Sequence, residues 1–225
     1  MRRKMDKYIS VITNFGCHYT CPYCIVRNNN LHIPKSTVEG LDNLEKEIRR
    51  NNCNWISLSG GGDPLWNFKY NLEWYAKFYM IALRTHMHTE VHTSITSIPK
   101  EISFDRVVYH LHDLKQLQFI KRNHDEEIVR VVFVVTKNFT EDLINRIAVY
   151  CHNSDEIDEL SFRQMVDEHY QETDYCKDYL KAGHQKLWWY IEQNDYNLYY
   201  CENKVYTEYR RIGEKICVYK IFKLT

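Results

Sequence analysis

Short runs rich in β-forming residues alternate with longer, charged stretches of helical character through the first 165 residues. Val, Ile, Thr and aromatic residues in the short runs predict six strands, at residues 8–14, 55–59, 90–96, 106–111, 128–136 and 159–166. Near-helical apolar spacing, as in Val38, Leu41 and Leu44, predicts helices at residues 37–50, 68–84, 113–122 and 141–152. Strands that alternate with helices form right-handed βαβ units, so we expect an α/β fold in which parallel strands make an open, partial (β/α)6 barrel.

The pattern changes after about residue 184. Residues 185–194, with Trp188 and Trp189, predict a helix, and three later runs predict strands, at residues 196–201, 204–209 and 215–222. The sequence at 202–204 is typical of a hairpin turn. Aromatic side chains in this part fit either a packed core or a ligand surface.

We therefore expect two units of unequal size. Residues 1–183 form the core domain, and residues 184–225 form a small, aromatic-rich C-terminal extension, a helix and a β-hairpin, that packs on the core. A chain of 225 residues is long enough to bury a substantial core of its own.

The composition gives no sign of a strongly charged or membrane partner. Lys plus Arg equals Asp plus Glu, at 30 each, and no run of about 18 apolar residues is present that would cross a membrane. The basic start, from Arg2 to Lys4, is not followed by the apolar segment of a secretory signal. We expect a cytoplasmic protein without a membrane or general nucleic-acid partner, in which clustered thiols bind metal more often than they form disulfides.

Three cysteines stand close together just after the first predicted strand. Cys17, Cys21 and Cys24 have the spacing Cx3Cx2C. Thiolates are the usual ligands of iron–sulfur clusters, normally four to a cubane, so three of them predict a [4Fe–4S] cluster with one iron open to another ligand. The alternative is a zinc site with His18 as fourth ligand, although adjacent side chains converge poorly on one ion and no second CxxC is present. The remaining cysteines have no short mutual spacing: Cys53, Cys151, Cys176, Cys201 and Cys217.

Glycine is scarce, yet three of the seven glycines stand together after the second predicted strand. Gly60, Gly61 and Gly62 are followed by Asp63 and Pro64. Glycine lets the main chain approach a ligand closely and adopt positive φ. In parallel α/β sheets the chemistry collects in loops at the carboxyl ends of the strands. We therefore expect the cysteine loop and the glycine loop to lie at the same edge of the sheet.

Together the two motifs resemble the radical S-adenosylmethionine superfamily, over about residues 8–166. The family signature is Cx3CxΦC with an aromatic residue at Φ, where this chain has Tyr23, and a GGEP-like segment after the second strand, where Asp63 replaces Glu. The resemblance implies that Cys17, Cys21 and Cys24 bind the [4Fe–4S] cluster and that Tyr23 lies near the adenine of S-adenosylmethionine. It further implies that the methionyl group of this cofactor is bound by the glycine loop, Gly60, Gly61, Gly62 and Asp63.

The resemblance also implies cofactor contacts at the next two strand ends. Ser94 ends the third predicted strand, and His110 takes the place in the fourth where a polar side chain approaches the ribose. The alternative for each is a polar residue at the sheet edge whose hydrogen bonds are made by its neighbours.

The activity implied by the resemblance is concrete. The methionyl amine and carboxylate chelate the open iron, and the cluster, reduced by a donor such as flavodoxin or ferredoxin, donates an electron that cleaves the cofactor to methionine and a 5′-deoxyadenosyl radical. This radical abstracts hydrogen from a substrate that stays open between a small molecule or nucleotide and a peptide. Alternatives are a glycyl-radical-enzyme activase, although Ile25 and Val26 depart from the usual activase motif, and a non-enzymatic iron–sulfur or zinc protein whose Trp188 and Trp189 stack on bases.

Overall fold

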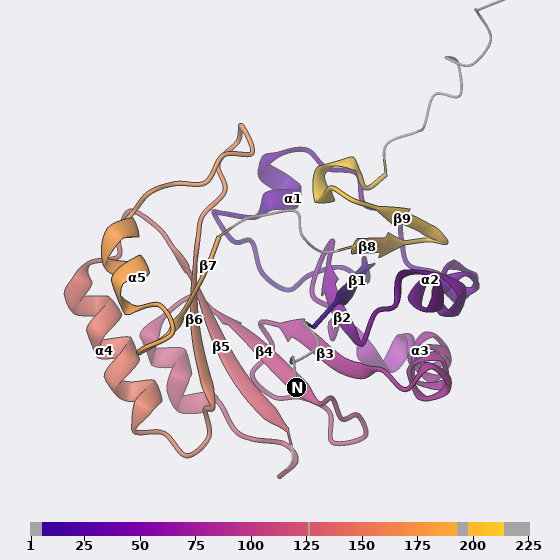
Figure 1. The fold of residues 1–225 in the computed structure, drawn as a ribbon, viewed down its shortest axis with the longest axis horizontal. Helices are drawn as coiled ribbons and strands as arrows, with labels where there is room; N and C mark the ends of the chain where they lie inside the picture. Colours follow the sequence, from indigo (N-terminus) through magenta and orange to yellow (C-terminus); the bar gives the residue numbers. More distant parts are fainter. Residues whose placement is uncertain (1–5, 126, 193–197, 214–225) are drawn as a thin grey trace, which may run out of the picture.

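The computed structural model describes residues 6–125, 127–192 and 198–213. Its strands form one nine-stranded sheet (Figure 1). The strand order is β7-β6-β5-β4-β3-β2-β1-β8-β9. All neighbours are parallel except β8 and β9, which are antiparallel. The strands are β1 (Tyr8–Thr13), β2 (Trp55–Gly60), β3 (His88–Thr93), β4 (Arg106–Leu111), β5 (Ile128–Val135), β6 (Glu159–Gln164), β7 (Trp189–Ile191), β8 (Leu198–Cys201) and β9 (Lys204–Tyr206).

Helical segments follow most of the parallel strands, although β3 is joined to β4 without one. In Figure 1, α2 and α3 flank the sheet beside β1 to β3, and α4 and α5 flank it beside β5 and β6. None of the described helices has both the length and the apolar character that crossing a bilayer requires. The helices are α1 (Ile25–Asn28), α2 (Leu44–Asn51), α3 (Leu72–Thr85), α4 (Glu141–His152) and α5 (Lys177–Gly183), and the 3-10 turns are η1 (Glu39–Leu41), η2 (Phe68–Tyr70), η3 (Leu114–Phe119) and η4 (Tyr209–Arg211).

The six strands predicted from the sequence are confirmed. The largest difference is at β3, which runs from His88 to Thr93 instead of residues 90–96. The predicted helix at residues 141–152 is α4, whose N-cap Thr140 accepts a hydrogen bond from the backbone N–H of Leu143 at 3.2 Å. The helices predicted at 37–50 and 68–84 each divide into a 3-10 turn followed by a helix, and that at 113–122 is the 3-10 segment η3.

The helix predicted over residues 185–194 is wrong for residues 185–192, and its last two residues lie outside the described part of the chain. The chain forms strand β7 there, parallel to β6, with Trp189 opposite Ser161. Burial alternates from one residue to the next, because Trp188 and Tyr190 are buried while Trp189 is 42% exposed, and this period of two is that of a strand. Trp188 is fixed beneath α5, since its indole N–H donates to the carbonyl oxygen of Leu180 at 2.9 Å.

The predicted hairpin is confirmed as β8 and β9, with Glu202 and Asn203 at positive φ in the turn. Its first strand joins the main sheet, where β8 pairs in parallel with β1. The predicted strand at 215–222 lies outside the described residues. The C-terminal part therefore extends the sheet at both ends, through β7 at one and through β8 and β9 at the other.

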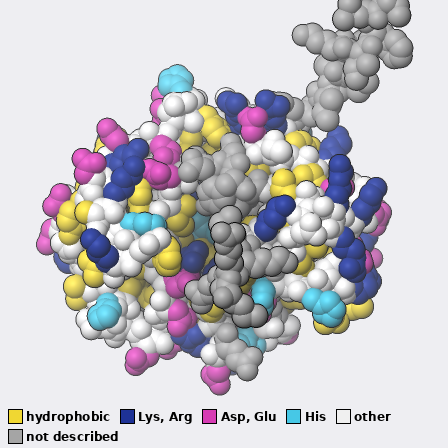
Figure 2. Space-filling model, viewed as in Figure 1, with side chains coloured by type: hydrophobic (Ala, Val, Ile, Leu, Met, Phe, Trp, Pro, Cys, Tyr) yellow, Lys and Arg dark blue, Asp and Glu magenta, His cyan; other side chains and the backbone are white. Residues whose placement is uncertain are grey.

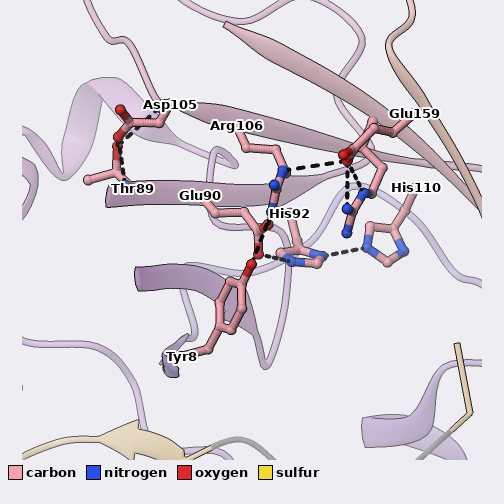
Figure 3. Close-up of polar contacts among 9 residues, drawn as sticks. Tyr8, Thr89, Glu90, His92, Asp105, Arg106, His110 and Glu159 are labelled. Atoms are coloured by element: carbon pink, nitrogen blue, oxygen red, sulfur yellow. Dashed lines mark hydrogen bonds and ion pairs between the residues drawn. The ribbon is translucent and has the colours of Figure 1, made fainter. Parts of the chain in front are cut away.

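The two faces of the sheet differ in chemistry. Every second side chain of a strand points to the same face, and on one face these side chains, such as Val107 and Tyr109 of β4, belong to the main hydrophobic core. Phe78 of α3 and Ile144 of α4 belong to the same core. The opposite face, which we call the inner face, carries charged and imidazole groups: Glu90, His92, Arg106, His110 and Glu159 (Figure 3). The ion pairs that Arg106 makes with Glu90 and Glu159 offset the cost of burying charge on this face.

The outer surface has no single dominant charge on the side viewed in Figure 2, where Lys and Arg lie among Asp and Glu. This agrees with the balanced composition of 30 basic and 30 acidic residues.

Candidate functional site

The cysteine loop and the glycine loop are hydrogen-bonded to each other at the carboxyl ends of β1 and β2. The backbone N–H of Gly61 donates to the carbonyl oxygen of Thr13 at 2.8 Å, and that of Asp63 donates to Gly16 at 3.0 Å. A Cβ on Gly62 would lie 2.1 Å from the Gly16 oxygen, so only glycine allows this approach. Two motifs separated by 36 residues in sequence are thus held side by side at one edge of the sheet, as the topology predicts.

The three motif cysteines lie on one loop between β1 and α1. Cys17 is exposed, Cys21 and Cys24 are partly buried, and all three are free thiols. Burial, followed by charge on Cys17 and Cys24, raises the pKa of Cys21 to about 11. Each thiolate makes ionisation of the other two thiols less favourable. All three are ionised together only beside a positive charge, which a metal centre provides.

The donor set fits an iron–sulfur cluster by its chemistry, since three free thiols stand on one loop. Within the described residues, no three His, Cys, Asp or Glu side chains are gathered as ligands of one ion. His18, the zinc alternative, instead has its Nδ1 4.0 Å from a carboxylate oxygen of Asp63 and its ring stacked on Trp66. The three cysteines are therefore the donor set whose chemistry fits such a cluster.

Asp63 joins the glycine loop to the end of β3. Its buried carboxylate accepts hydrogen bonds from the hydroxyl of Thr93 at 2.8 and 3.0 Å, and from the N–H and hydroxyl of Ser94 at 2.7 and 2.9 Å. It also accepts from the N–H of Leu65 at 3.0 Å. The structure thus brings Ser94 to the glycine loop, and the Asp63 side chain is occupied in holding two strand ends together.

Gly60, the last residue of β2, is held from the C-terminal part of the chain. Its carbonyl oxygen accepts a hydrogen bond from the hydroxyl of Tyr209 at 2.8 Å. Burial raises the pKa of this phenol, so the hydroxyl stays protonated and remains a donor. The C-terminal extension therefore contributes a side chain to the support of the glycine loop.

His112 is a site residue that sequence reasoning did not single out. Its Nε2 lies 3.8 Å from the sulfur of Cys21, and its Nδ1 is hydrogen-bonded to the hydroxyl of Tyr23. Its ring also packs on Tyr19, with centroids 4.4 Å apart. The position follows β4 by one residue, so the strand-end rule that selected His110 was the signal that could have found it.

His110 lies on the inner face, apart from the glycine-loop contacts. Its Nε2 is 2.9 Å from Nδ1 of His92, and Nε2 of His92 is 2.9 Å from Glu90 (Figure 3). Burial, followed by the charges of His92, Arg163 and His112, lowers the pKa of His110 well below its ordinary value, against the opposing effect of Glu90. His110 is therefore a neutral imidazole at neutral pH.

The predicted site residues consequently form three groups. Gly61, Gly62, Asp63 and Ser94 are joined at the glycine loop. Tyr23 and Cys21 meet at His112, and His110 meets His92. All three groups lie at or just below the carboxyl edge of β1 to β4.

Comparison with known proteins gives likeness in fold. No family model matches the sequence, and no curated protein sequence matches it. Among solved structures, SuiB of Streptococcus suis bound to its precursor peptide SuiA has a TM-score of 0.56 at 14% identity, over 84% of this chain and 49% of that one. SuiB bound to S-adenosylmethionine has the same TM-score and identity, over 84% of this chain and 48% of that one. The chain thus spans about half the length of these proteins and shares their fold over most of its own.

Proposed function

We propose that this chain is a radical S-adenosylmethionine enzyme, in which Cys17, Cys21 and Cys24 hold a [4Fe–4S] cluster and the glycine loop holds S-adenosylmethionine. The observation that carries the proposal is the direct hydrogen bonding of the cysteine loop to the glycine loop through Gly16 and Asp63. A tight turn alone explains the glycines, but it does not explain why they lie against the only three clustered thiols of the sequence. On this proposal β1 to β6 serve as a partial (β/α)6 barrel.

When bound, the cluster and S-adenosylmethionine together supply one-electron cleavage of a carbon–sulfur bond and hydrogen abstraction from a substrate. The part of the chain is to bind and orient. Because Gly61 and Gly62 have no side chain, Ile33 and the Gly16 carbonyl pack directly against this loop and fix the main chain that would bind the methionyl group. Asp63 with Ser94 keeps the ends of β2 and β3 together. Tyr23, fixed by its hydrogen bond to His112, forms an aromatic surface beside the cysteine loop that suits an adenine ring.

The likeness to SuiB supports this proposal. SuiB has the same fold and was crystallised with S-adenosylmethionine, and a fold that binds this cofactor in one protein offers the same strand-end loops in another. SuiB was also crystallised with a precursor peptide, which favours a peptide among the open substrate classes. The substrate of this chain is left as a small molecule, a nucleotide or a peptide, and its reductant as a flavodoxin or ferredoxin.

The test is anaerobic reconstitution with iron and sulfide, followed by dithionite and S-adenosylmethionine. We expect the charge-transfer absorption of a cluster and the release of 5′-deoxyadenosine, detected by chromatography. Cys21→Ala should remove both signals. Cys53→Ala is the matched control, because Cys53 is also a partly buried free thiol but lies between α2 and β2, and it should retain both.

The alternatives give different results in the same assay. A fully loaded cluster without any 5′-deoxyadenosine would identify a non-enzymatic iron–sulfur protein, and zinc in place of iron would identify a zinc protein. Either result refutes the proposal. Loss of hydrogen from a glycine of a partner enzyme would select the activase alternative.

A further inference from the structure

A chain of three titratable side chains crosses the inner face from β3 to β4. Nε2 of His92 lies 2.9 Å from a carboxylate oxygen of Glu90, and Nδ1 of His92 lies 2.9 Å from Nε2 of His110 (Figure 3). Glu90 and His92 share this face because side chains alternate along a strand. Both nitrogens of His92 are therefore engaged, and the series runs without a gap from a carboxylate to His110.

Glu90, at one end of this series of hydrogen-bonded side chains, is an anion that its partners hold in place. Glu90 is 4% exposed and also accepts a hydrogen bond from Nη1 of Arg106 at 3.0 Å. Burial alone would raise the pKa of Glu90, but His92 and then Arg106 outweigh it and lower this pKa to about 2. Arg106 is held in turn by the hydroxyl of Tyr8 at 3.1 Å and by Glu159 at 3.6 Å. Glu90 is thus an ionised acceptor at neutral pH.

The anion decides which nitrogen of each histidine carries the proton. Because carboxylate can only accept, Nε2 of His92 is the donor to Glu90. In neutral His92, Nδ1 is then the acceptor, so Nε2 of His110 must donate to it. Nδ1 of His110 is left with a lone pair, and no described side chain is hydrogen-bonded to it.

This lone pair lies near the place proposed for the cofactor. His112, two residues beyond His110 on the same face, is the residue that contacts Cys21 and Tyr23. Two residues of a strand span about 7 Å, so His110 lies one such step below the cysteine loop. His110 is therefore within reach of a molecule bound beside the cysteine loop.

Positive charge is disfavoured on His110. Burial comes first in lowering the pKa of His110, and three charges that face it follow: His92 of β3, Arg163 of β6 and His112 after β4. Glu90 opposes them. A proton passed from His110 to His92 comes to lie beside an opposite charge, because Nε2 of His92 is 2.9 Å from the Glu90 carboxylate.

We propose that His110 is a catalytic base that takes a proton at Nδ1 from the bound substrate and passes its Nε2 proton to Nδ1 of His92, where Glu90 neutralises the charge. An O–H or N–H bond of the substrate breaks, its electron pair stays on the oxygen or nitrogen, and the proton count of the histidine pair rises by one. His92 and Glu90 act as positioning residues. That the bound molecule is a substrate of hydrogen abstraction rests on the proposed function. The substrate class is then a molecule that has a dissociable O–H or N–H group near the hydrogen that is abstracted.

The test is nitrogen-15 NMR of histidine side chains in the full reconstituted chain in its oxidised state, with resonances assigned from His92→Gln and His110→Gln. At pH 7.5 both histidines should be protonated on Nε2 only. On acidification, the first added proton should make His92 an imidazolium while His110 stays neutral and changes to the Nδ1–H tautomer. A His110 already protonated on Nδ1 at pH 7.5 would overturn the proposal without need of any variant.

Glu90→Gln tests the role of the anion. Removing an opposite charge in contact with His92 should lower the titration midpoint of the pair by about 1–3 pH units, a tenfold to thousandfold loss of proton affinity. Asp105→Asn is the matched control, because Asp105 accepts from Thr89 at 2.7 and 2.9 Å and contacts His88, away from the relay. It should change the His88 resonances alone. An unchanged midpoint in Glu90→Gln would refute the relay.

Addition of 5′-deoxyadenosine with methionine tests the location. We expect the Nδ1 resonance of His110 to shift. If 5′-deoxyadenosine and methionine bind and this resonance does not change, His110 lies outside the cofactor site and the proposal is refuted. Release of 5′-deoxyadenosine from S-adenosylmethionine is read separately. If S-adenosylmethionine is cleaved but His110 is protonated on Nδ1 at pH 7.5, the relay is overturned and the proposed function stands. If the histidine spectra are as expected but S-adenosylmethionine is not cleaved, the proposed function is overturned and the relay stands.

Discussion

Gly62 is the position at which a single methyl group should separate the two loops of the site. In Gly62→Ala the new Cβ would lie 2.1 Å from the carbonyl oxygen of Gly16 and 2.8 Å from its carbonyl carbon. Both atoms belong to the main chain, so no side-chain rotation relieves the overlap. Ordinary contact distance requires the loops to part by more than about 1 Å. The hydrogen bond from Asp63 to Gly16, now 3.0 Å, would then be lost.

The expected cost follows from these two effects. Overpacking at a tight site costs about 1–3 kcal/mol, and loss of one backbone hydrogen bond costs about 1 kcal/mol. We therefore expect Gly62→Ala to lower the free energy of unfolding by about 2–4 kcal/mol in urea titration. The reconstituted variant should still take up iron, because the thiols are untouched, but should release less than about a tenth as much 5′-deoxyadenosine, since a misplacement of about 1 Å costs about 100-fold in rate.

Gly40→Ala is the matched control for this prediction. A Cβ on buried Gly40 would also lie too close to its neighbours, but the atoms that it would meet belong to the side chain of Glu202, which can turn aside. We expect this control to lose about 1 kcal/mol of stability and to cleave S-adenosylmethionine at the normal rate. If Gly62→Ala were as stable as Gly40→Ala and equally active, the tight contact between the two loops would not be what positions the cofactor, and the reasoning would be refuted.

Three further predictions concern the fold. The pKa of Glu90 is lowered to about 2 from 4.5, so the stability that ionised Glu90 gives the fold is present above pH 4.5 and is lost as the pH falls toward 2. In urea titrations at pH 7, Glu90→Gln should lower the free energy of unfolding by about 3 kcal/mol. Between pH 4.5 and pH 2 the free energy of unfolding should fall less in this variant than in the unmodified protein. Trp188→Ala should cost about 3–5 kcal/mol and Trp189→Ala less than about 1, because only Trp188 is buried, and equal losses would contradict strand β7. Tyr200→Phe should cost about 1–2 kcal/mol in the same titration, since its buried hydroxyl donates to a carbonyl at 2.9 Å, and no loss would show that this contact adds nothing.

Local pattern was sufficient for the six central strands because each is a β-rich run bounded by polar residues. It failed at Trp189, since a segment with aromatic and polar residues fits a helix or a strand by periodicity alone. The parallel pairing of β8 with β1 joins Leu198 to Ile9 across almost the whole chain, and a contact of that kind leaves no local signal.

The sequence by itself determined the thiols, the glycine loop and their common position at one edge of the sheet. The reason is that alternation of strands and helices predicts parallel strands, whose carboxyl ends lie at the same edge. Only the tertiary structure decided what each side chain meets there. His112 reaches Cys21, Asp63 is occupied by Thr93 and Ser94, and His110 continues through His92 to Glu90. The physical reason is register: pairing of neighbouring strands sets which side chains face one another, and a shift of one residue would send them to the opposite face.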